Sequence, residues 1–398
     1  MPGCVAARTD PSPAHRTTPQ ARQSTCDQVS DVSVSVEKYP VTKTTPVPET
    51  PYLAVDIDVL KRNLAAMAVT AAERGLALRP HVKTHKSPEI AALQLEAGAV
   101  GITVATVSEA EVFAEAGFGD VFIAYPLWVD SSRGARLRAL AERCVLLVGV
   151  DSAEGAQMLA RNTSGGGPFS VLVEIDSGHH RTGVVPDQAG ELAAAALAAG
   201  LDVRGVFTFP GHSYGPGLAA TAAADEARAL DEAVACLLAA GIRPEVVSGG
   251  STPTAALSYG GTATELRPGV YVFNDAQQFE MGTCELSEVA LTAVGTVVSR
   301  APGRVVLDAG SKTLGADRPA WATGFGLLAD YPQARVSALS EHHATVAWAG
   351  LSPPELGTSL RVVPNHACAA VNLADELFVV RAGAVIERWK VAARGANN

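Results

Sequence analysis

From about residue 52 onward, short runs of Val, Ile and Leu alternate with longer Ala-rich stretches. This alternation of strand-length apolar runs with helical stretches is typical of parallel βα units. Eight such units in about 230 residues favour a closed (β/α)8 barrel over an open sheet. We predict strands that begin near Leu76, Val100, Val121, Val145, Ser170, Val203, Glu245 and Val270.

Beyond about residue 285 the helical periodicity fades, and apolar runs are separated by Gly and Pro. This pattern indicates a second, mainly β domain. Its strands are predicted over 290–307, 344–349, 359–363 and 377–389. We therefore assign a barrel to 49–285 and a β domain to 286–398, with the strand near 50–56 as a further candidate member of the β domain. A seam between a barrel mouth and another domain is a usual place for a ligand pocket.

The first 48 residues differ from the rest of the chain in composition and in the absence of hydrophobic periodicity. Residues 1–48 are rich in Ser, Thr, Pro and Arg and show no periodicity. A segment of this composition predicts a disordered tail. It contains no apolar h-region, which argues against a secretory signal.

Composition narrows the class of protein. The chain has 398 residues, of which 47% are hydrophobic, and this is enough to bury a large core. Its net charge of −10 argues against nucleic acid and against an anionic membrane surface as partners. No uncharged apolar run approaches the roughly 18 residues of a membrane span. The six cysteines are scattered, so we expect reduced thiols and a cytoplasmic protein with a small-molecule ligand.

The most informative segment is Leu76-Ala-Leu-Arg-Pro-His-Val-Lys-Thr-His-Lys86. Alternation along a strand puts Arg79, His81 and Lys83 on the face that points into the barrel. Burying basic groups inside a barrel is energetically unfavourable unless an anionic group pairs with them. We place Lys83 at the C-terminal end of the strand, where barrel active sites lie and where neighbouring cations and burial lower the pKa of an amine. Such a lysine is a usable nucleophile.

Two alternatives remain open for this segment. The basic residues can pair with Glu174 and Asp176 in an ordinary barrel network. Lys86 also competes with Lys83 for the role of nucleophile, although it follows the strand and is expected at the rim.

The stretch Arg79-Pro-His-Val-Lys-Thr-His-Lys86 resembles the cofactor-lysine segment of the D-serine dehydratase and D-threonine aldolase family. These are fold type III enzymes that share the alanine-racemase-type barrel, and the likeness runs from about residue 50 to 389. The resemblance implies that pyridoxal 5'-phosphate forms a Schiff base with Lys83 and that His81 lies beside the cofactor.

A glycine-rich turn, Ser248-Gly-Gly-Ser-Thr-Pro-Thr254, follows the strand near Glu245. Backbone N–H groups in such a turn can converge on one anion, with hydroxyls as further donors. The turn alone is weak evidence, but after a late barrel strand it is a candidate for phosphate. We therefore assign the phosphate to the residues Gly249, Gly250, Ser251 and Thr252. Arg267-Pro-Gly-Val-Tyr271 resembles the Arg-x-Gly segment of alanine racemases, which implies phosphate contacts from Gly269 and Val270 with Tyr271 in the same pocket.

Two further segments match the family. Val173-Glu-Ile-Asp-Ser-Gly-His-His-Arg-Thr-Gly183 resembles a stretch whose arginine approaches the phenolic oxygen of the cofactor, which implies that role for Arg181. The alternative is that Arg181 pairs with Asp176 and only braces the loop. In Gly211-His-Ser-Tyr-Gly215, Tyr214 corresponds to a family tyrosine near the cofactor, and His212 is a candidate to reach the substrate. Either can instead be a hydrogen-bonded wall residue.

A metal motif is present in Val363-Pro-Asn-His-Ala-Cys368. On an extended segment His366 and Cys368 project to the same side, and an imidazole with a thiolate suits zinc best, with Mn²⁺ or Mg²⁺ as alternatives. A buried cysteine beside a surface histidine is the plainer interpretation. The family has a histidine followed two residues later by cysteine or aspartate, which favours the metal. Ser340-Glu-His-His-Ala344 resembles a family segment beside that metal, and His342 stands where an acidic residue is common.

These parts together predict a lyase that depends on pyridoxal 5'-phosphate and a divalent metal and acts on D-β-hydroxy amino acids. Cysteine at the second ligand position favours a D-serine dehydratase-like reaction that gives pyruvate and ammonia. The alternative is a D-threonine aldolase-like cleavage to glycine and an aldehyde.

Two other classes are less favoured. An amino-acid racemase needs two bases and no metal, and a non-catalytic cofactor carrier of the small barrel type lacks the β domain. The resemblance to alanine racemases, which pair barrel against β domain, implies a homodimer.

Overall fold

The computed structural model describes residues 47–164, 169–258, 261–349 and 352–398. All of these belong to one compact unit, residues 41–398. The tail predicted over 1–48 lies, except for its last two residues, outside the described residues. Among the helices of the described segments, none combines the length and the apolar character needed to cross a membrane.

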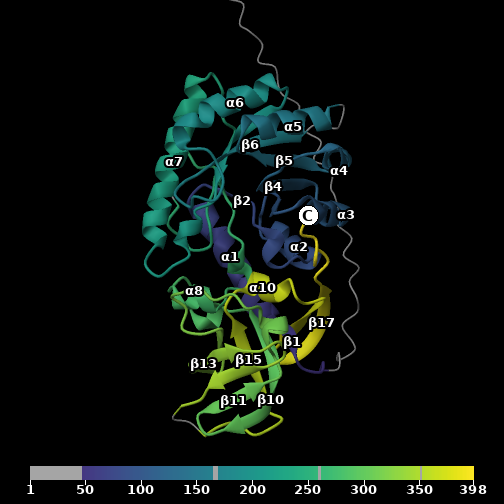
Figure 1. Cartoon of the computed structure of the whole chain (residues 1–398), viewed down its shortest axis with the longest axis vertical. Coiled ribbons are helices and arrows are strands. Elements are labelled where there is room, and N and C mark those ends of the chain that lie inside the picture. Colours follow the sequence, from purple (N-terminus) through teal and green to yellow (C-terminus); the bar gives the residue numbers. More distant parts are fainter. Residues whose placement is uncertain (1–46, 165–168, 259–260, 350–351) are drawn as a thin grey trace, which may run out of the picture. The chain divides into compact units, whose positions relative to one another are not determined.

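The first sheet is a parallel barrel. Its two edge strands are joined because Val100 N donates to Leu78 O at 2.9 Å and Thr103 N donates to Pro80 O at 2.8 Å. The predicted alanine-racemase-type (β/α) barrel is therefore confirmed (Figure 1). In spatial order the strands are β2 (Ala77–Leu78), β9 (Glu265–Leu266), β8 (Val246–Gly249), β7 (Asp202–Thr208), β6 (Phe169–Ile175), β5 (Val145–Val150), β4 (Asp120–Pro126) and β3 (Ile102–Val104).

Helices follow the barrel strands and bury their apolar faces against the outside of the sheet. Short 3-10 turns lie mainly after the strands, where the chain bends toward the site. The α-helices are α1 (Ile57–Glu73), α2 (Pro88–Glu96), α3 (Val107–Glu115), α4 (Ser131–Ala141), α5 (Ala153–Thr163), α6 (Ala189–Ala198), α7 (Ala219–Ala239), α8 (Ala276–Glu280), α9 (Ser311–Leu314) and α10 (Ala367–Val371). The 3-10 turns are η1 (Val82–Thr84), η2 (Pro186–Gln188), η3 (Gly211–Ser213), η4 (Val270–Val272) and η5 (Leu286–Glu288).

An apolar plug fills the inside of the barrel. Phe122, Leu147, Leu172 and Phe207 project inward and form one buried cluster. The rings of Phe122 and Phe207 meet edge to face, with centroids 5.0 Å apart, a favourable aromatic arrangement. Arg267 lies against both rings, so polar side chains begin directly above the plug.

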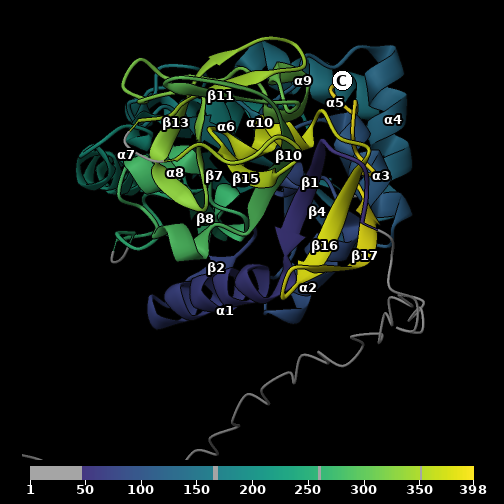
Figure 2. The same ribbon diagram turned by 90° about the horizontal axis from the view of Figure 1, so that it is seen from below.

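The second sheet is mainly antiparallel and is closed by pairing of β10 with β11, which confirms the predicted β domain as a fold class. The early strand β1 belongs to this sheet, where it runs parallel to β16 and antiparallel to β10 (Figure 2). In spatial order the strands are β11 (Arg304–Leu307), β14 (Ala344–Ala347), β13 (Tyr331–Leu339), β12 (Gly326–Leu328), β15 (Ser359–Pro364), β10 (Leu291–Ala301), β1 (Tyr52–Asp56), β16 (Glu376–Arg381) and β17 (Ala384–Lys390).

Two predicted barrel strands differ from the structure. The eighth lies at Glu265–Leu266, and the predicted start at Val270 is the first residue of η4. Pro268 has no N–H to donate to a ladder, so the strand ends before it. The first strand is also shorter than predicted, because the chain turns after Pro80 and places Lys83 in η1.

Candidate active site

A cavity of about 670 Å³ lies at the C-terminal ends of the barrel strands and is also lined by residues of the β domain. It gathers residues that are far apart in the sequence, including both halves of the predicted chemistry. Of the predicted site residues, it is lined by His81, Lys83, Arg181, Tyr214, Ser251, Gly269, Val270, His366 and Cys368.

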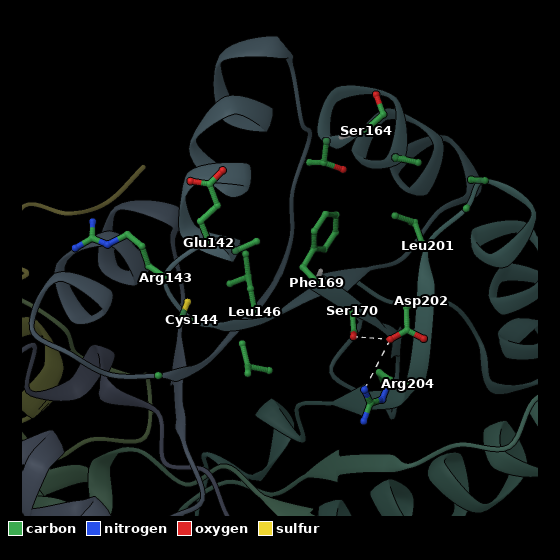
Figure 3. A pocket seen from close by; sticks show the side chains of 17 residues that line it. Glu142, Arg143, Cys144, Leu146, Ser164, Phe169, Ser170, Leu201, Asp202 and Arg204 are labelled. Atoms are coloured by element: carbon green, nitrogen blue, oxygen red, sulfur yellow. Dashed lines mark hydrogen bonds and ion pairs between the residues drawn. The ribbon is translucent and has the colours of Figure 1, made fainter. Parts of the chain in front are cut away.

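A larger hollow of about 1010 Å³ lies at the opposite ends of the strands, where β5, β6 and β7 begin (Figure 3). Its Asp202 is already engaged, since its carboxylate accepts from Ser170 Oγ at 2.6 Å and lies 3.8 Å from Arg204. Burial raises the pKa of Cys144 to about 11, so its thiol is a poor nucleophile. The reactive groups therefore belong to the smaller cavity.

Lys83 reaches the cavity from η1. Burial lowers its pKa, and the positive charge of Arg181 acts in the same direction against the raising effect of Cys368. Lys83 Nζ lies 5.7 Å from the centroid of the Phe209 ring, and Arg181 lies over the same ring. His81 Nδ1 accepts from the Lys83 backbone N at 3.4 Å, and burial holds the pKa of His81 well below its usual value. A half-buried amine with a lowered pKa beside a neutral imidazole is suited to nucleophilic attack on a carbonyl.

Basic side chains near Lys83 do not form the network suggested by the sequence. Arg79 instead pairs with Glu265 at 2.7 Å and with Asp120 at 2.5 Å. Asp176 accepts from the backbone and ring of His180, so His180 and not Arg181 braces that turn. The basic residues therefore do not pair with Glu174 and Asp176, and Arg181 does not pair with Asp176. The Arg181 side chain instead lines the cavity.

Most N–H groups of the glycine-rich turn point away from the cavity. Gly250 N donates to Glu226 Oε1 on α7 at 2.5 Å, and Ser251 N donates to Thr254 Oγ1 at 2.9 Å. Gly249 packs so closely against Glu226 that a Cβ there would lie 2.3 Å from Oε1. The structure thus places Gly249 and Gly250 outside the lining, and only Ser251 of this turn reaches the cavity.

The next turn does face the cavity. In the described part of the chain, the N–H groups of Gly269 and Val270 have no hydrogen-bond acceptor. A Cβ at Gly269 would lie 2.9 Å from Thr84 Oγ1, so only glycine lets this turn approach η1. These two donors are placed to bind an anion in the cavity.

Three of the predicted residues have other partners. Thr252 Oγ1 accepts from Tyr271 N at 3.1 Å, which braces the turn. The Tyr271 hydroxyl accepts from Gln94 Nε2 at 3.1 Å on α2, outside the cavity lining. His212 Nε2 lies 3.3 Å from Asp225 Oδ2 on α7 and also lies outside the lining. Tyr214, by contrast, lines the cavity, and burial raises the pKa of its hydroxyl.

His366 and Cys368 both line the cavity, although the predicted extended geometry between them is wrong. His366 is the N-cap of α10 and Cys368 lies in the first turn of that helix. Burial works to raise the pKa of Cys368, but the charge and hydrogen bond of His366, with smaller contributions from Thr84 and Lys83, together lower that pKa. His366 Nδ1 also bonds Asp317 Oδ2 at 2.8 Å. A thiolate beside an imidazole that is oriented by a carboxylate is a common arrangement for zinc.

The described residues offer no larger donor set. Within those segments, no three His, Cys, Asp or Glu side chains are grouped closely enough to hold a metal alone. Ser340 to His343 form the exposed turn between β13 and β14, where Glu341 pairs with Lys312 at 2.8 Å. Neither His342 nor His343 lines the cavity. A metal held by His366 and Cys368 would thus keep most of its coordination positions open.

Sequence reasoning missed three buried polar groups of this cavity. Glu174 appeared only as a pairing partner, yet its Oε2 is buried and has no partner among the described residues. Its Oε1 accepts from Thr182 Oγ1 at 2.9 Å, and burial raises its pKa to about 7. Gln278 Oε1 is likewise buried without a partner in the described segments, and Asp275 joins α8 to α10. The sequence did contain a signal for Glu174. It lies two residues after the inward-pointing Leu172 on β6, so the alternation of side chains along a strand places it on the same inner face.

Comparisons with known proteins cover most of the chain. Residues 55–277 match the family described as "Alanine racemase, N-terminal domain", and residues 290–380 match the "Putative serine dehydratase domain" family. D-threo-3-hydroxyaspartate dehydratase of Delftia sp. is 36% identical over 86% of this chain and 97% of its own. D-threonine aldolase of Arthrobacter sp. is 35% identical over 87% of this chain and 93% of its own. The crystal structure of D-threonine aldolase from Filomicrobium marinum has a TM-score of 0.79 at 32% identity and covers 88% of this chain and 97% of that one.

Proposed function

Because the chain belongs to the D-serine dehydratase and D-threonine aldolase family of fold type III lyases, we propose that it is a dehydratase of D-β-hydroxy amino acids. It would depend on pyridoxal 5'-phosphate and on a divalent metal, with Zn²⁺ the best match, and D-serine is the predicted substrate. The observation that carries the proposal is that Lys83 and the His366–Cys368 pair line one cavity.

The residues of the cavity fit pyridoxal 5'-phosphate. The N–H groups of Gly269 and Val270, which have no acceptor among the described residues, are suited to its phosphate together with the Ser251 hydroxyl. Lys83 supplies the amine that would bind its aldehyde, and Arg181 supplies a cation for its phenolic oxygen. Gly249 and Gly250 of the Gly-Gly-Ser turn are not among the residues that line the cavity, so the proposed phosphate contacts are those predicted for Gly269, Val270 and Ser251.

The donor set also fits a metal that binds substrate. The thiolate and imidazole of Cys368 and His366 are soft and borderline ligands, a combination that favours zinc over magnesium. Asp317 behind His366 would fix the orientation of the ring, as carboxylates commonly do behind metal-bound histidines. The open positions leave room for a hydroxyl of the substrate.

When bound, the cofactor would supply an electron sink for negative charge at Cα, and the metal a Lewis acid for the β-hydroxyl. The proton transfers would be carried out by residues of the chain. Lys83 would remove the Cα proton of the substrate, and burial lowers the pKa of its amine, which favours the unprotonated form that can accept this proton. The Cβ–O bond would then break, and the leaving hydroxide would take up the proton that Lys83 removed from Cα, so that it departs as water. The resulting enamine hydrolyses to a keto acid and ammonia. The apolar plug below the cavity closes the barrel floor to water.

An aldol cleavage is the second candidate, and the matching D-threonine aldolases favour it. In that reaction the β-hydroxyl loses its proton and the Cα–Cβ bond breaks, which gives glycine and an aldehyde. The same residues would serve both reactions. A racemase has no use for the His366–Cys368 pair, so it is the weakest of the three.

Product analysis tests the proposal. The purified protein would be incubated with D-serine and D-threonine, with and without EDTA, and the products identified by mass spectrometry. Keto acid formed only with metal, and lost in Lys83→Ala but kept in the exposed-lysine control Lys61→Ala, is the expected result. Glycine with an aldehyde would replace the dehydratase by the aldolase. Turnover that is indifferent to EDTA and to Cys368→Ala would refute the role of the metal.

The cytoplasmic location and the homodimer stay predictions. Light scattering of the purified protein at several concentrations measures its mass directly. A mass of two chains is expected, and a monomer at concentrations where the protein is active would contradict the homodimer.

A further inference from the structure

The second lysine of the motif, Lys86, is buried and fully engaged. Its side chain is 6% exposed, and its backbone has a φ of 51°, in the left-handed region. Its ammonium donates to Asn372 Oδ1 at 2.7 Å and to Asn397 Oδ1 at 3.2 Å, and lies 3.3 Å from Glu109 Oε1. An ammonium has three protons, and each of them has an acceptor here.

Each acceptor lies on a different part of the fold. Glu109 belongs to α3, Asn372 is the C-cap of α10, and Asn397 lies in the segment that follows β17. Figure 1 shows this last segment, in yellow, running from β17 to a position beside α3. The Lys86 backbone adds a fourth link, because its carbonyl accepts from Ala393 N at 3.1 Å.

The link to α10 is the one that bears on the chemistry. This helix starts from His366 and holds Cys368 in its first turn, and Asn372 N donates to Cys368 O at 3.1 Å. Lys86 lies three residues after Lys83, and its own N donates to Val82 O at 2.8 Å. A single ammonium therefore connects the loop that carries Lys83 to the helix that carries the two metal-ligand candidates.

Burial makes this connection specific. A buried ammonium is stable only where its charge and all its protons are satisfied, so Lys86 strongly disfavours any position of α10 that leaves it unpaired. Its charge is balanced by Glu109, which is itself only 2% exposed and also accepts from Ala105 N at 2.7 Å. Because its ammonium is held by these contacts, Lys86 has no free amine with which to attack a carbonyl.

We propose that Lys86 is a positioning residue that holds His366 and Cys368 at a set distance from Lys83. The inference rests on the proposed function for its use of the metal. We expect the Lys86 ammonium to fix the position of α10 relative to η1 before any ligand binds. Loss of Lys86 then weakens metal binding while Lys83 stays competent to hold the cofactor.

Two measurements on the full chain test this inference. Zn²⁺ affinity would be measured by competition with a chromophoric chelator, and backbone order by hydrogen exchange of the metal-free protein. For Lys86→Met we expect roughly tenfold to a hundredfold weaker Zn²⁺ binding, the usual effect of losing a supporting contact behind metal ligands. We also expect amides of α10 to exchange about tenfold faster or more, with those of β16 and β17 unchanged. Visible absorbance of the lysine-bound cofactor is retained.

Matched variants separate positioning from general destabilisation. Lys86→Met with Glu109→Gln removes the carboxylate that Lys86→Met alone would leave buried and unpaired, so its unfolding midpoint recovers while Zn²⁺ binding stays weak. Asn372→Ala removes only the link to α10, so it weakens Zn²⁺ binding, with some loss of stability because one proton of the buried Lys86 ammonium loses its acceptor. Lys61→Met, on the exposed face of α1, changes neither quantity.

The outcomes that overturn the inference differ from those that overturn the function. Wild-type Zn²⁺ affinity in the double variant and in Asn372→Ala, or unchanged exchange of α10 in Lys86→Met, refutes positioning by Lys86. Loss of the cofactor absorbance in Lys86→Met with retention in Lys83→Ala would instead make Lys86 the cofactor lysine. If the wild-type protein binds no Zn²⁺, the proposed function fails, and the exchange of α10 alone decides whether Lys86 orders that helix.

Discussion

Glu226 offers a sharp test of the electrostatics behind the glycine-rich turn. It is 4% exposed on α7, and its Oε1 accepts the Gly250 N–H at 2.5 Å. Burial raises the pKa of this carboxyl to about 7, against the opposing effects of the Gly250 hydrogen bond and of Arg267. An acid of this kind stays protonated in the folded state at a pH where the unfolded chain has already lost its proton.

The sign and size of the effect follow by linkage. Because the folded pKa is raised, the contribution of Glu226 to stability is fully present below about pH 4.5 and is lost as pH rises through about 7. At about 1.4 kcal/mol per pKa unit, this shift corresponds to a loss of about 3 kcal/mol by pH 8. Glu226→Gln removes that loss, since a glutamine amide keeps an acceptor for Gly250 N and does not ionise. The variant should match the wild type at pH 4.5 and exceed its stability by about 3 kcal/mol at pH 8.

Urea unfolding at a series of pH values, followed by circular dichroism, measures this difference. Glu232→Gln on the exposed face of α7 is the matched control and should track the wild type within about 0.5 kcal/mol at every pH. A stability difference between Glu226→Gln and wild type that does not change with pH would refute the reasoning. Destabilisation of the variant at pH 8 would refute it as well, because it would show that the ionised carboxylate is the stabilising form.

Three further predictions concern packing and the metal site. Phe207→Ala empties part of the barrel plug and should cost about 3–5 kcal/mol in urea unfolding; a cost below about 1 kcal/mol would show that the plug repacks. Gly205→Ala should cost about 2 kcal/mol or more by the same assay, because its φ is 149° and a Cβ would lie 1.9 Å from Val246 O; wild-type stability would contradict this. Asp317→Ala should weaken Zn²⁺ binding about tenfold to a hundredfold in chelator competition, and Asp317→Asn should weaken it less, since it can still accept from His366 Nδ1; equal losses would show that charge and not orientation matters.

Local patterns predicted the fold well where an element is stabilised by its own sequence. The barrel strands β3 to β8 are apolar runs bounded by helices, and their positions follow from that pattern alone. The prediction is weaker where a strand is short or interrupted. β12 has only three residues, and β13 contains Pro332 near its start, so neither has a clear alternating signature.

The local geometry of the site depended on residues distant in sequence. Ala367 N donates to Asp275 Oδ2 at 3.0 Å across 92 positions, which caps α10 and turns the His366–Cys368 segment from the predicted extended form into a helix start. Gly250 N similarly turns away from the cavity because Glu226 on α7 accepts from it. Residue types at the site could be predicted from motifs, whereas the direction of each group depends on such long-range partners.

The most direct test of the account is to find which lysine binds the cofactor. The protein would be incubated with pyridoxal 5'-phosphate, reduced with borohydride to fix any lysine adduct, digested, and mapped by mass spectrometry. We expect a single modified residue, Lys83, with Lys86 unmodified because its ammonium is bonded to Glu109, Asn372 and Asn397. Modification of Lys86 in place of Lys83, or no modification near the barrel mouth, would contradict it.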